Sequence, residues 1–257
     1  FGRYHTPINW WNTAFHHGQW LQTSIDRPEM TRFGGRFIPV HFVGALAEGA
    51  APARGLNLNY NFGVGNGRGS VIARSGDHGD ANSNRAWLIN LFVKPDRLFG
   101  LQAGGSVYRD RITLAPGREF SEWITALHLV WQKEDPEVIA EAANINHREL
   151  GRPGSFNSQA YYVQLAYRLP WFEKLWKPYY RFEYIHMPRT DPVFVRVLAP
   201  DAVFRRVPTL ANLAGSVLGV RYDISTYAAI KLEYRNQRRA PAQPRLNAVF
   251  AQTSFTF

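Results

Sequence analysis

The sequence contains no cysteine, and this absence excludes disulfide frameworks, thiolate metal sites and cysteine nucleophiles together. It also lacks an apolar run long enough for a membrane-spanning helix, because the best candidate, residues 210–220, is interrupted by Asn212, Gly215 and Ser216. The sequence therefore argues against cysteine-dependent enzymes and against membrane proteins built from helices.

An initiating methionine and a signal peptide are missing as well. The chain begins at Phe1, in a segment that already has the pattern of a strand. We therefore expect one barrel domain over residues 1–257 that is incomplete at its N-terminus.

Aromatic residues make up 14% of the chain, and apolar and polar residues alternate along several segments. In residues 55–64 every second residue is apolar, and the residues between them are asparagine or glycine. Residues 160–169, 180–184 and 228–235 repeat the pattern. Period-two alternation is typical of a strand with two different faces. It fits a soluble β-sandwich as well as a barrel in lipid, so alternation alone does not separate the two.

The connections between the predicted strands distinguish these folds. Turn signals predict short connections at residues 95–96, 134–135 and 225, whereas residues 8–35, 110–118 and others form longer loops. Short turns at one end and long loops at the other are typical of outer-membrane barrels. We therefore predict an all-β, transmembrane, antiparallel up-and-down β-barrel of about twelve strands, with both termini in the periplasm. The expected strands are residues 1–8, 36–48, 54–64, 84–94, 97–109, 119–133, 136–148, 158–169, 177–188, 210–223, 226–236 and 245–257.

The last predicted strand places Val249, Ala251, Thr253, Phe255 and Phe257 on one face. Apolar alternation that ends in an aromatic residue resembles the terminal strand of bacterial outer-membrane proteins, which their assembly machinery recognises. We therefore expect this strand to contact that machinery, and the chain to lie in the bacterial outer membrane among lipid and lipopolysaccharide.

The beginning of the chain carries a family resemblance. Residues 2–7, Gly-Arg-Tyr-His-Thr-Pro, are followed by residues 21–28 and by Gly34-Gly35 before the next strand. Over roughly the first fifth of the chain, this arrangement resembles bacterial porins of the phosphate-selective and related type. Those porins are longer and carry a ladder of arginine and lysine down the pore, whereas this chain has no dense lysine ladder. It is either a smaller relative or part of a longer barrel, and the phosphate preference is not carried over.

In a barrel of this size the polar face of each strand points into the lumen, so strand parity predicts the pore-lining residues. The late strands contribute most of the charge, and they contribute both signs. These charges would form either an eyelet that selects solutes by charge or a salt-bridged filling. The predicted pore-lining residues are Arg3, His5, Asn57, Asn59, Asn61, Gln102, Ser106, Gln164, Arg168, Arg181, Glu183, Arg221, Lys231, Glu233 and Arg235.

The first long loop is too apolar for a loop surrounded by water. Its aromatic and histidine residues include Trp10, Trp11, Phe15, His16, His17 and Trp20. We expect it to fold into the lumen as a constriction or to contact a partner; a short surface helix is the alternative. Adjacent histidines seldom converge on one ion, so the sequence predicts no metal site and no cofactor.

Arginine outnumbers lysine 25 to 5, and the formal net charge is +10. Guanidinium groups bind phosphate in a bidentate manner, so arginines at the long-loop end predict a rim that binds lipopolysaccharide or attracts anions. A solvated surface is the alternative. The predicted rim consists of Arg109, Arg111, Arg148, Arg152, Arg205, Arg206, Arg238 and Arg239.

Three functions remain open. The first is a porin for passive diffusion of small hydrophilic solutes, with a preference for anions. The second is a structural barrel subunit of an envelope complex, and in either case the chain is expected to form homo-oligomers or larger assemblies. The third, a soluble β-protein that binds nucleic acid, needs a solvated face that the alternating aromatics do not provide. Some twelve-stranded barrels are lipases, but Ser121 and His128 have no evident orienting partner, so no enzyme is predicted.

Overall fold

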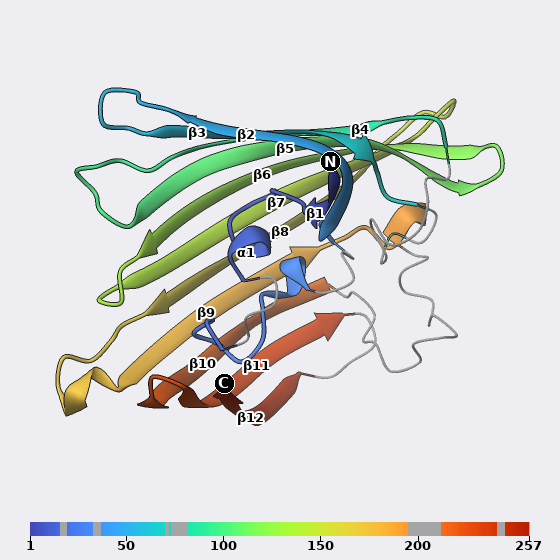
Figure 1. Ribbon diagram of the computed structural model, residues 1–257. Coiled ribbons are helices and arrows are strands. Elements are labelled where there is room, and N and C mark those ends of the chain that lie inside the picture. Colours follow the sequence, from blue (N-terminus) through green and yellow to red (C-terminus); the bar gives the residue numbers. More distant parts are fainter. Residues whose placement is uncertain are drawn as a thin grey trace.

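The chain forms one antiparallel sheet of twelve strands, and each strand pairs with its neighbours in sequence from β1 to β12 (Figure 1). The computed structural model describes residues 1–15, 20–32, 37–69, 72, 82–194, 212–240 and 245–256. The predicted all-β, up-and-down fold of about twelve strands is therefore confirmed. Within the described ranges, no helix has the length and apolar character needed to cross a membrane.

All twelve observed strands overlap the predicted ones. The strands are β1 (Gly2–His5), β2 (His41–Ala51), β3 (Leu58–Asn66), β4 (Ala86–Val93), β5 (Leu101–Ala115), β6 (Arg118–Gln132), β7 (Glu137–Glu149), β8 (Phe156–Ala166), β9 (Trp176–His186), β10 (Asn212–Ser225), β11 (Ala228–Ala240) and β12 (Leu246–Phe255). Short helices of the described part of the chain include α1 (Trp11–Ala14), η1 (Glu29–Thr31) and η3 (Phe172–Lys174).

One predicted loop is wrong. Residues 110–118 continue β5 and β6, and the two strands meet at a tight turn around Pro116 and Gly117. The alternation continues there, since Ile112 and Leu114 are buried on the same side of β5. Gly117 has a φ of 72°, which glycine adopts without steric cost and which this turn requires.

The sheet curls around the connection between β1 and β2, so that α1 and η1 lie in its hollow (Figure 1). We call the described part of residues 6–40 the inner loop, and the side of the sheet that it contacts the inner face. Much of the inner loop is buried, including Ile8, Trp11 and Ile38 at 0% exposure. The long first loop is therefore folded against the sheet.

The opposite, outer face of the sheet is apolar and exposed. Along β6, buried inward residues alternate with exposed outward residues such as Trp123, Leu127 and Leu129. Leu127 is 68% exposed and Leu218 is 59% exposed. Among the outward positions of the described strands β3–β12, side chains of Asp, Glu, Lys and Arg occur only near the long-loop end. These are Arg109, Arg111, Glu119, Arg148 and Arg238.

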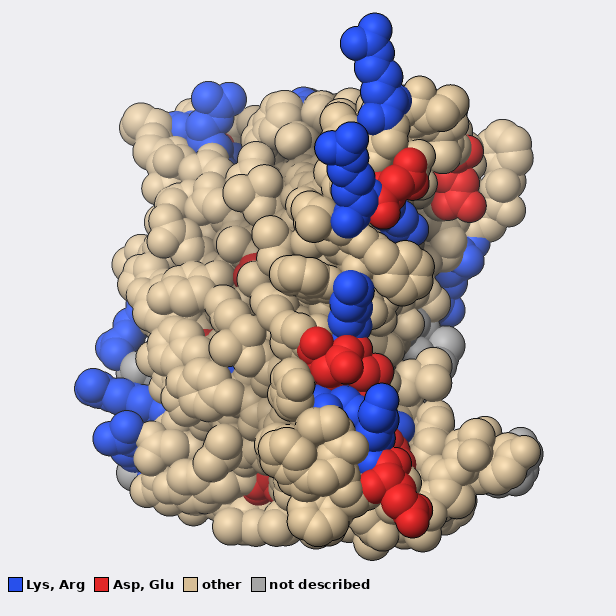
Figure 2. Space-filling view, turned by 90° about the vertical axis from the view of Figure 1, so that its left-hand side faces the viewer, with Lys and Arg blue, Asp and Glu red and all other residues tan. Residues whose placement is uncertain are grey.

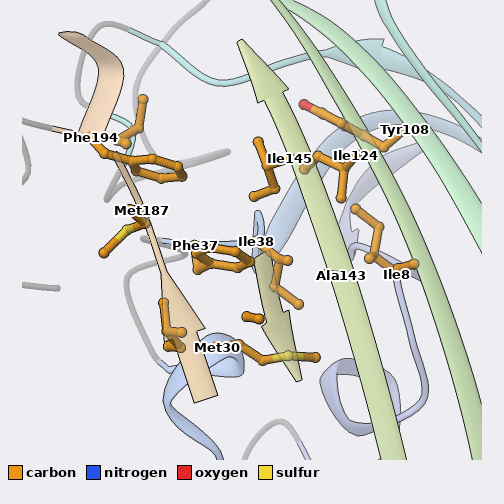
Figure 3. Close-up of a cluster of buried hydrophobic side chains, with 14 of the residues drawn as sticks. Ile8, Met30, Phe37, Ile38, Tyr108, Ile124, Ala143, Ile145, Met187 and Phe194 are labelled. Atoms are coloured by element: carbon orange, nitrogen blue, oxygen red, sulfur yellow. The ribbon is translucent and has the colours of Figure 1, made fainter. Parts of the chain in front are cut away.

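A hydrophobic cluster joins the inner loop to the sheet near the long-loop end (Figure 3). Phe37 of the inner loop stacks on Phe194, which follows β9, with ring centroids 5.7 Å apart. Tyr108 and Ile145 contribute from β5 and β7. Burial of each large apolar side chain stabilises such a cluster by about 1.5–3 kcal/mol, so the inner loop is held by packing as well as by polar contacts.

The strand parity predicted for β1 is wrong. Tyr4 pairs with Phe42, and the two rings lie 5.5 Å apart in contact with the core cluster. Arg3 and His5 therefore lie on the outer face, where Arg3 Nη2 is 2.9 Å from His41 Nδ1. The reason is that the hollow is apolar at this point, so the aromatic side chains of β1 and β2 face it and the basic ones do not.

Candidate functional site

The charged residues of the late strands gather on the inner face, but the inner loop covers them. Arg181, Lys231 and Glu233 are each no more than 1% exposed. Side chains that line a water-filled passage would be exposed, whereas these have exchanged water for contacts with the protein. The inward-facing charged residues of the predicted set are Arg181, Glu183, Arg221, Lys231, Glu233 and Arg235, whereas Arg168 lies beyond the end of β8.

Arg181 of β9 binds the inner loop directly. Its Nη1 donates to Ser24 Oγ at 2.7 Å and to the carbonyl oxygen of Asp26 at 2.9 Å. Its Nε donates to Glu183 Oε1 at 2.7 Å, and Glu183 Oε2 accepts the backbone N–H of Glu29 at 2.7 Å. The neighbouring acid and base therefore hold two separate points of the inner loop against β9.

The charges of β11 hold the same part of the inner loop from the other side. Glu233 Oε2 accepts the backbone N–H of Ile25 at 3.1 Å, and Lys231 Nζ donates to the carbonyl oxygen of Ser24 at 3.3 Å. Arg235 Nη2 lies 2.8 Å from Asp26 Oδ2. Charge-assisted hydrogen bonds of this kind are about twice as strong as neutral ones, so β9 and β11 fix residues 24–26 between them.

Trp20, one of the predicted loop aromatics, lies against Arg221 of β10. The Arg221 guanidinium is 5.0 Å from the Trp20 ring centroid, and its Nη1 donates to the Trp20 carbonyl oxygen at 2.8 Å. Arg221 also pairs with Asp223 at 2.7 Å, close to the short turn between β10 and β11. The inner loop therefore extends through the hollow to the short-turn end.

Trp10 and Trp11 lie at the opposite wall. Both backbone N–H groups donate to Glu141 Oε1 of β7, each at 2.7 Å. The Trp11 ring also packs edge-on against Tyr162 of β8, at 5.9 Å. Glu141 and Glu137, which lie two inward positions apart on β7, were absent from the predicted site, and Glu137 accepts from Thr23 Oγ1 at 2.9 Å. Their shared parity with the buried Ile139 was the signal that could have found them.

Glu29 is an ion-pair centre within the inner loop. Arg239 Nη2 and Arg32 Nη1 donate to Glu29 Oε2 at 3.0 and 2.9 Å. Burial raises the pKa of the Glu29 carboxyl, but the two guanidinium groups outweigh burial and hold that pKa below its ordinary value. Arg239, predicted for the outer rim, instead faces the hollow, because its neighbour Arg238 takes the outward position.

A second ion-pair network lies at the short-turn end, between the β6–β7 turn, the end of β8, β9 and β10. Arg168 pairs with Glu134 and Asp223, and Lys177 Nζ lies 3.1 Å from Glu134 and 2.7 Å from Glu137. Burial raises the pKa of Glu134, but Lys177 and Arg168 outweigh it and hold that pKa below its ordinary value. Figure 2, which faces the short-turn side of Figure 1, shows side chains of both signs alternating in a band across this end.

A third polar network lies under the hydrophobic cluster, and the sequence did not predict it. His147 of β7 lies between Glu122 Oε2 and Asp191 Oδ2, at 2.8 and 2.7 Å. Arg68 Nη1 pairs with the same Glu122 oxygen at 3.1 Å, and its Nη2 donates to the Phe37 carbonyl oxygen at 2.6 Å. Asp191, Arg68 and Phe37 lie in three different connections between strands, and this network joins all three to β6 and β7. Strand parity predicts the faces of strand residues but not the positions of loop residues, so it could not predict these contacts.

The remaining inner wall, on β3–β6 near the short turns, is polar and neutral within these strands, and Asn61 Nδ2 donates to Glu48 Oε2 of the neighbouring β2 at 3.3 Å. Asn90 Nδ2 donates to Asn61 Oδ1 at 2.8 Å, and Gln102 Nε2 lies 3.0 Å from His128 Nε2. Asn61 and Gln102 are half-buried. This wall can exchange hydrogen bonds with solutes, whereas the charges of the late strands are already engaged.

Several predicted rim arginines lie together on the outer face. Arg111 and Arg148 are both opposite Ser121 on β6, and Arg109 lies one row away with its guanidinium 5.9 Å from the Trp123 ring centroid. Arg152 is 69% exposed beyond the end of β7. Trp87 packs edge-on against Trp123 at 5.6 Å, so cationic and aromatic side chains meet at one level of the sheet.

Four predicted site residues, His16, His17, Arg205 and Arg206, lie outside the described residues, as does Phe257. Among the residues with described positions, no group of three metal-ligating side chains could hold an ion. Ser121 faces outward and His128 inward, so these two residues do not form a catalytic pair.

Comparison with protein-family models finds no match to the chain, and comparison with curated proteins finds none either. The resemblance to phosphate-selective porins therefore remains a prediction.

Proposed function

We propose that the chain is an outer-membrane porin of a Gram-negative bacterium, a channel for passive diffusion of small hydrophilic solutes. The observation that carries this proposal is the distribution of side chains over the twelve strands. The outer face is apolar and exposed, and its Asp, Glu, Lys and Arg side chains lie only near the long-loop end in the described strands β3–β12. Such a face suits the hydrocarbon of a bilayer, whereas a soluble sandwich would cover it with a second sheet.

In this proposal the sheet closes into a barrel, with the short turns and both termini on the periplasmic side. Arg109, Arg111 and Arg148 then lie at the level of lipopolysaccharide phosphates, next to Trp87 and Trp123. The apolar outward row of β12 is the segment that the assembly machinery would recognise. Homo-oligomers, or contacts within an envelope complex, would use the outer face.

The inner loop sets the bore. It engages the charges of the late strands on β9 and β11, and it also reaches β5, where the Asn9 backbone N–H donates to Ser106 Oγ at 3.3 Å. Solutes would pass along the neutral wall of β3–β6, so the preference for anions would come from the arginine rim at the mouth rather than from a charged eyelet. The channel is therefore narrow and only weakly selective for charge.

Planar-bilayer recordings test the proposal. We expect small stepwise conductances, with a reversal potential in a salt gradient that favours anions. The control is the same protein after heat denaturation, which should give no steps. A folded barrel that never conducts would contradict the porin function.

A structural barrel within an envelope complex is the second candidate. The extent of the inner loop favours it, because backbone and side-chain contacts run from Glu141 to Arg221 across the hollow. Purification from membranes distinguishes the two: a non-conducting barrel that co-purifies with one stoichiometric partner supports the structural function.

A further inference from the structure

A cavity of about 470 Å³ opens at the short-turn end of the neutral wall. It lies between the β4–β5 turn, the ends of β5 and β6, and Trp10 of the inner loop. Lys94, Asp96 and Phe99 are exposed at its mouth, whereas Trp10 is 7% exposed and forms the deep side. The volume falls within the range of about 300–1,000 Å³ that is common for small-molecule sites.

Two carboxamide groups line this cavity, those of Gln102 and Gln132. Gln102 Nε2 is 3.0 Å from His128 Nε2, so its side chain is held in place. His128 is 4% exposed, and its Nδ1 has no hydrogen-bond partner in the part of the chain that the structure describes. A carboxamide both donates and accepts, which matches the hydroxyl groups of a polyol.

The charges at the mouth do not favour an ion of either sign. Lys94 and Asp96 balance each other, and Asp96 Oδ1 already accepts from Asn57 Nδ2. Lys94 Nζ lies 5.3 Å from the Phe92 ring centroid. The late-strand arginines are bound to the inner loop on the other side of the hollow, so they are not available to a solute here.

Two aromatic residues line the cavity. Phe99 is 79% exposed, whereas Trp10 is buried at 7% exposure. An aromatic face packs well against the C–H groups of a sugar ring, while amide groups bind its hydroxyls. A free ion would interact with the amide groups but not with the aromatic faces, and an aliphatic solute would contact the aromatic faces but not the amide groups.

We propose that this cavity binds a neutral saccharide of one or two rings at the periplasmic end of the channel. Trp10 and Phe99 contact the C–H faces of the sugar, and Gln102 and Gln132 exchange hydrogen bonds with its hydroxyls. The inference rests on the proposed channel function, because it names the solute class that the channel would carry.

Titration of the detergent-solubilised protein with maltose tests the site. We expect a saturable change in tryptophan fluorescence, and Trp10→Phe should remove most of it. Gln132→Ala, at an exposed position, should weaken the affinity by about fivefold through the loss of hydrogen bonds. Gln159→Ala is the matched control, because this glutamine is exposed on the outer face and should leave the affinity unchanged. Gluconate should bind at least about tenfold more weakly than maltose.

Bilayer recordings on the same preparation separate this inference from the channel function. A maltose-dependent decrease in ion current would support both. If maltose does not change the ion current, and the tryptophan fluorescence does not saturate up to about 0.1 M maltose, the saccharide site is overturned and the porin function still stands. Saturable binding without conductance would support the site and contradict the porin. Equal affinity in the wild type, Gln132→Ala and Gln102→Ala would place the sugar elsewhere.

Discussion

Arg181 donates a hydrogen bond to the hydroxyl of Ser24 at 2.7 Å, and this contact joins residues that are 157 positions apart in the chain. It lies within a buried group in which β9 also binds the Glu29 backbone and β11 binds Asp26. The inward charges of the late strands thus position the inner loop. Of the two interpretations of these charges, a salt-bridged filling accounts for their burial better than a charged eyelet does.

Removal of Arg181 should release the inner loop. Arg181→Met leaves the Glu183 carboxylate buried without its guanidinium, which typically destabilises a protein by about 3–5 kcal/mol. We expect a lower denaturant midpoint in micelles and a larger single-channel conductance. Arg97→Met, in the exposed β4–β5 turn, is the control and should change neither. An unchanged midpoint for Arg181→Met would show that the loop is held by other contacts.

Acid should loosen the loop at Glu29. Its pKa lies below the ordinary value of 4.5, so its pairing stabilises the folded loop above about pH 4.5, and that contribution is lost as the pH falls through the folded pKa. Conductance recorded between pH 6 and pH 3 should therefore rise at the acidic end.

Glu29→Gln is the control for this acid effect. The variant keeps the size of the side chain but removes its charge, so Arg32 and Arg239 lose their ionic partner at all pH values. Its conductance should already be raised at pH 6 and should respond less to acid. A full wild-type response in Glu29→Gln would show that Glu29 does not carry the acid effect.

The arginine rim should retain lipopolysaccharide. Basic side chains near an anionic membrane surface each contribute about 1 kcal/mol, so each substitution in the set Arg109→Ala, Arg111→Ala and Arg148→Ala should weaken binding by roughly fivefold. Co-purified lipopolysaccharide, measured per mole of protein, gives the readout. Arg54→Ala at the short-turn end is the control. Equal retention in the triple variant and the control would assign these arginines to a merely solvated surface.

The sequence could predict which face of the sheet each strand residue occupies, because side chains alternate between the two faces. Side chains alternate with period two, so the faces of Arg181, Glu183 and Lys231 follow from the apolar residues beside them. The same argument failed at Arg3 and His5, because Tyr4 and Phe42 face an apolar part of the hollow that only the folded inner loop creates. The prediction for Arg3 and His5 assumed that the lumen beside β1 is filled with water.

The partners of the inward charges could not be predicted. Glu141 binds the backbone amides of Trp10 and Trp11. Every residue except proline has a backbone N–H group, so the sequence does not show which of these groups will bind a carboxylate. These residues are about 130 positions apart, so their contact depends on how the whole sheet curls. The turn signals identified the connections of the fold, but not where the connections lie in space.

A charge on the outer face tests whether that face meets lipid. Leu127 is 68% exposed on β6, and an arginine near the middle of the hydrocarbon costs a barrel about 2–4 kcal/mol. We therefore expect Leu127→Arg to fold poorly into lipid vesicles, as followed by heat-modifiable migration on gels. Leu98→Arg is the matched control, because Leu98 is also exposed, at 48%, but lies in a short turn outside the bilayer. In a soluble protein both substitutions would be tolerated equally, and the wild type would remain in solution without detergent.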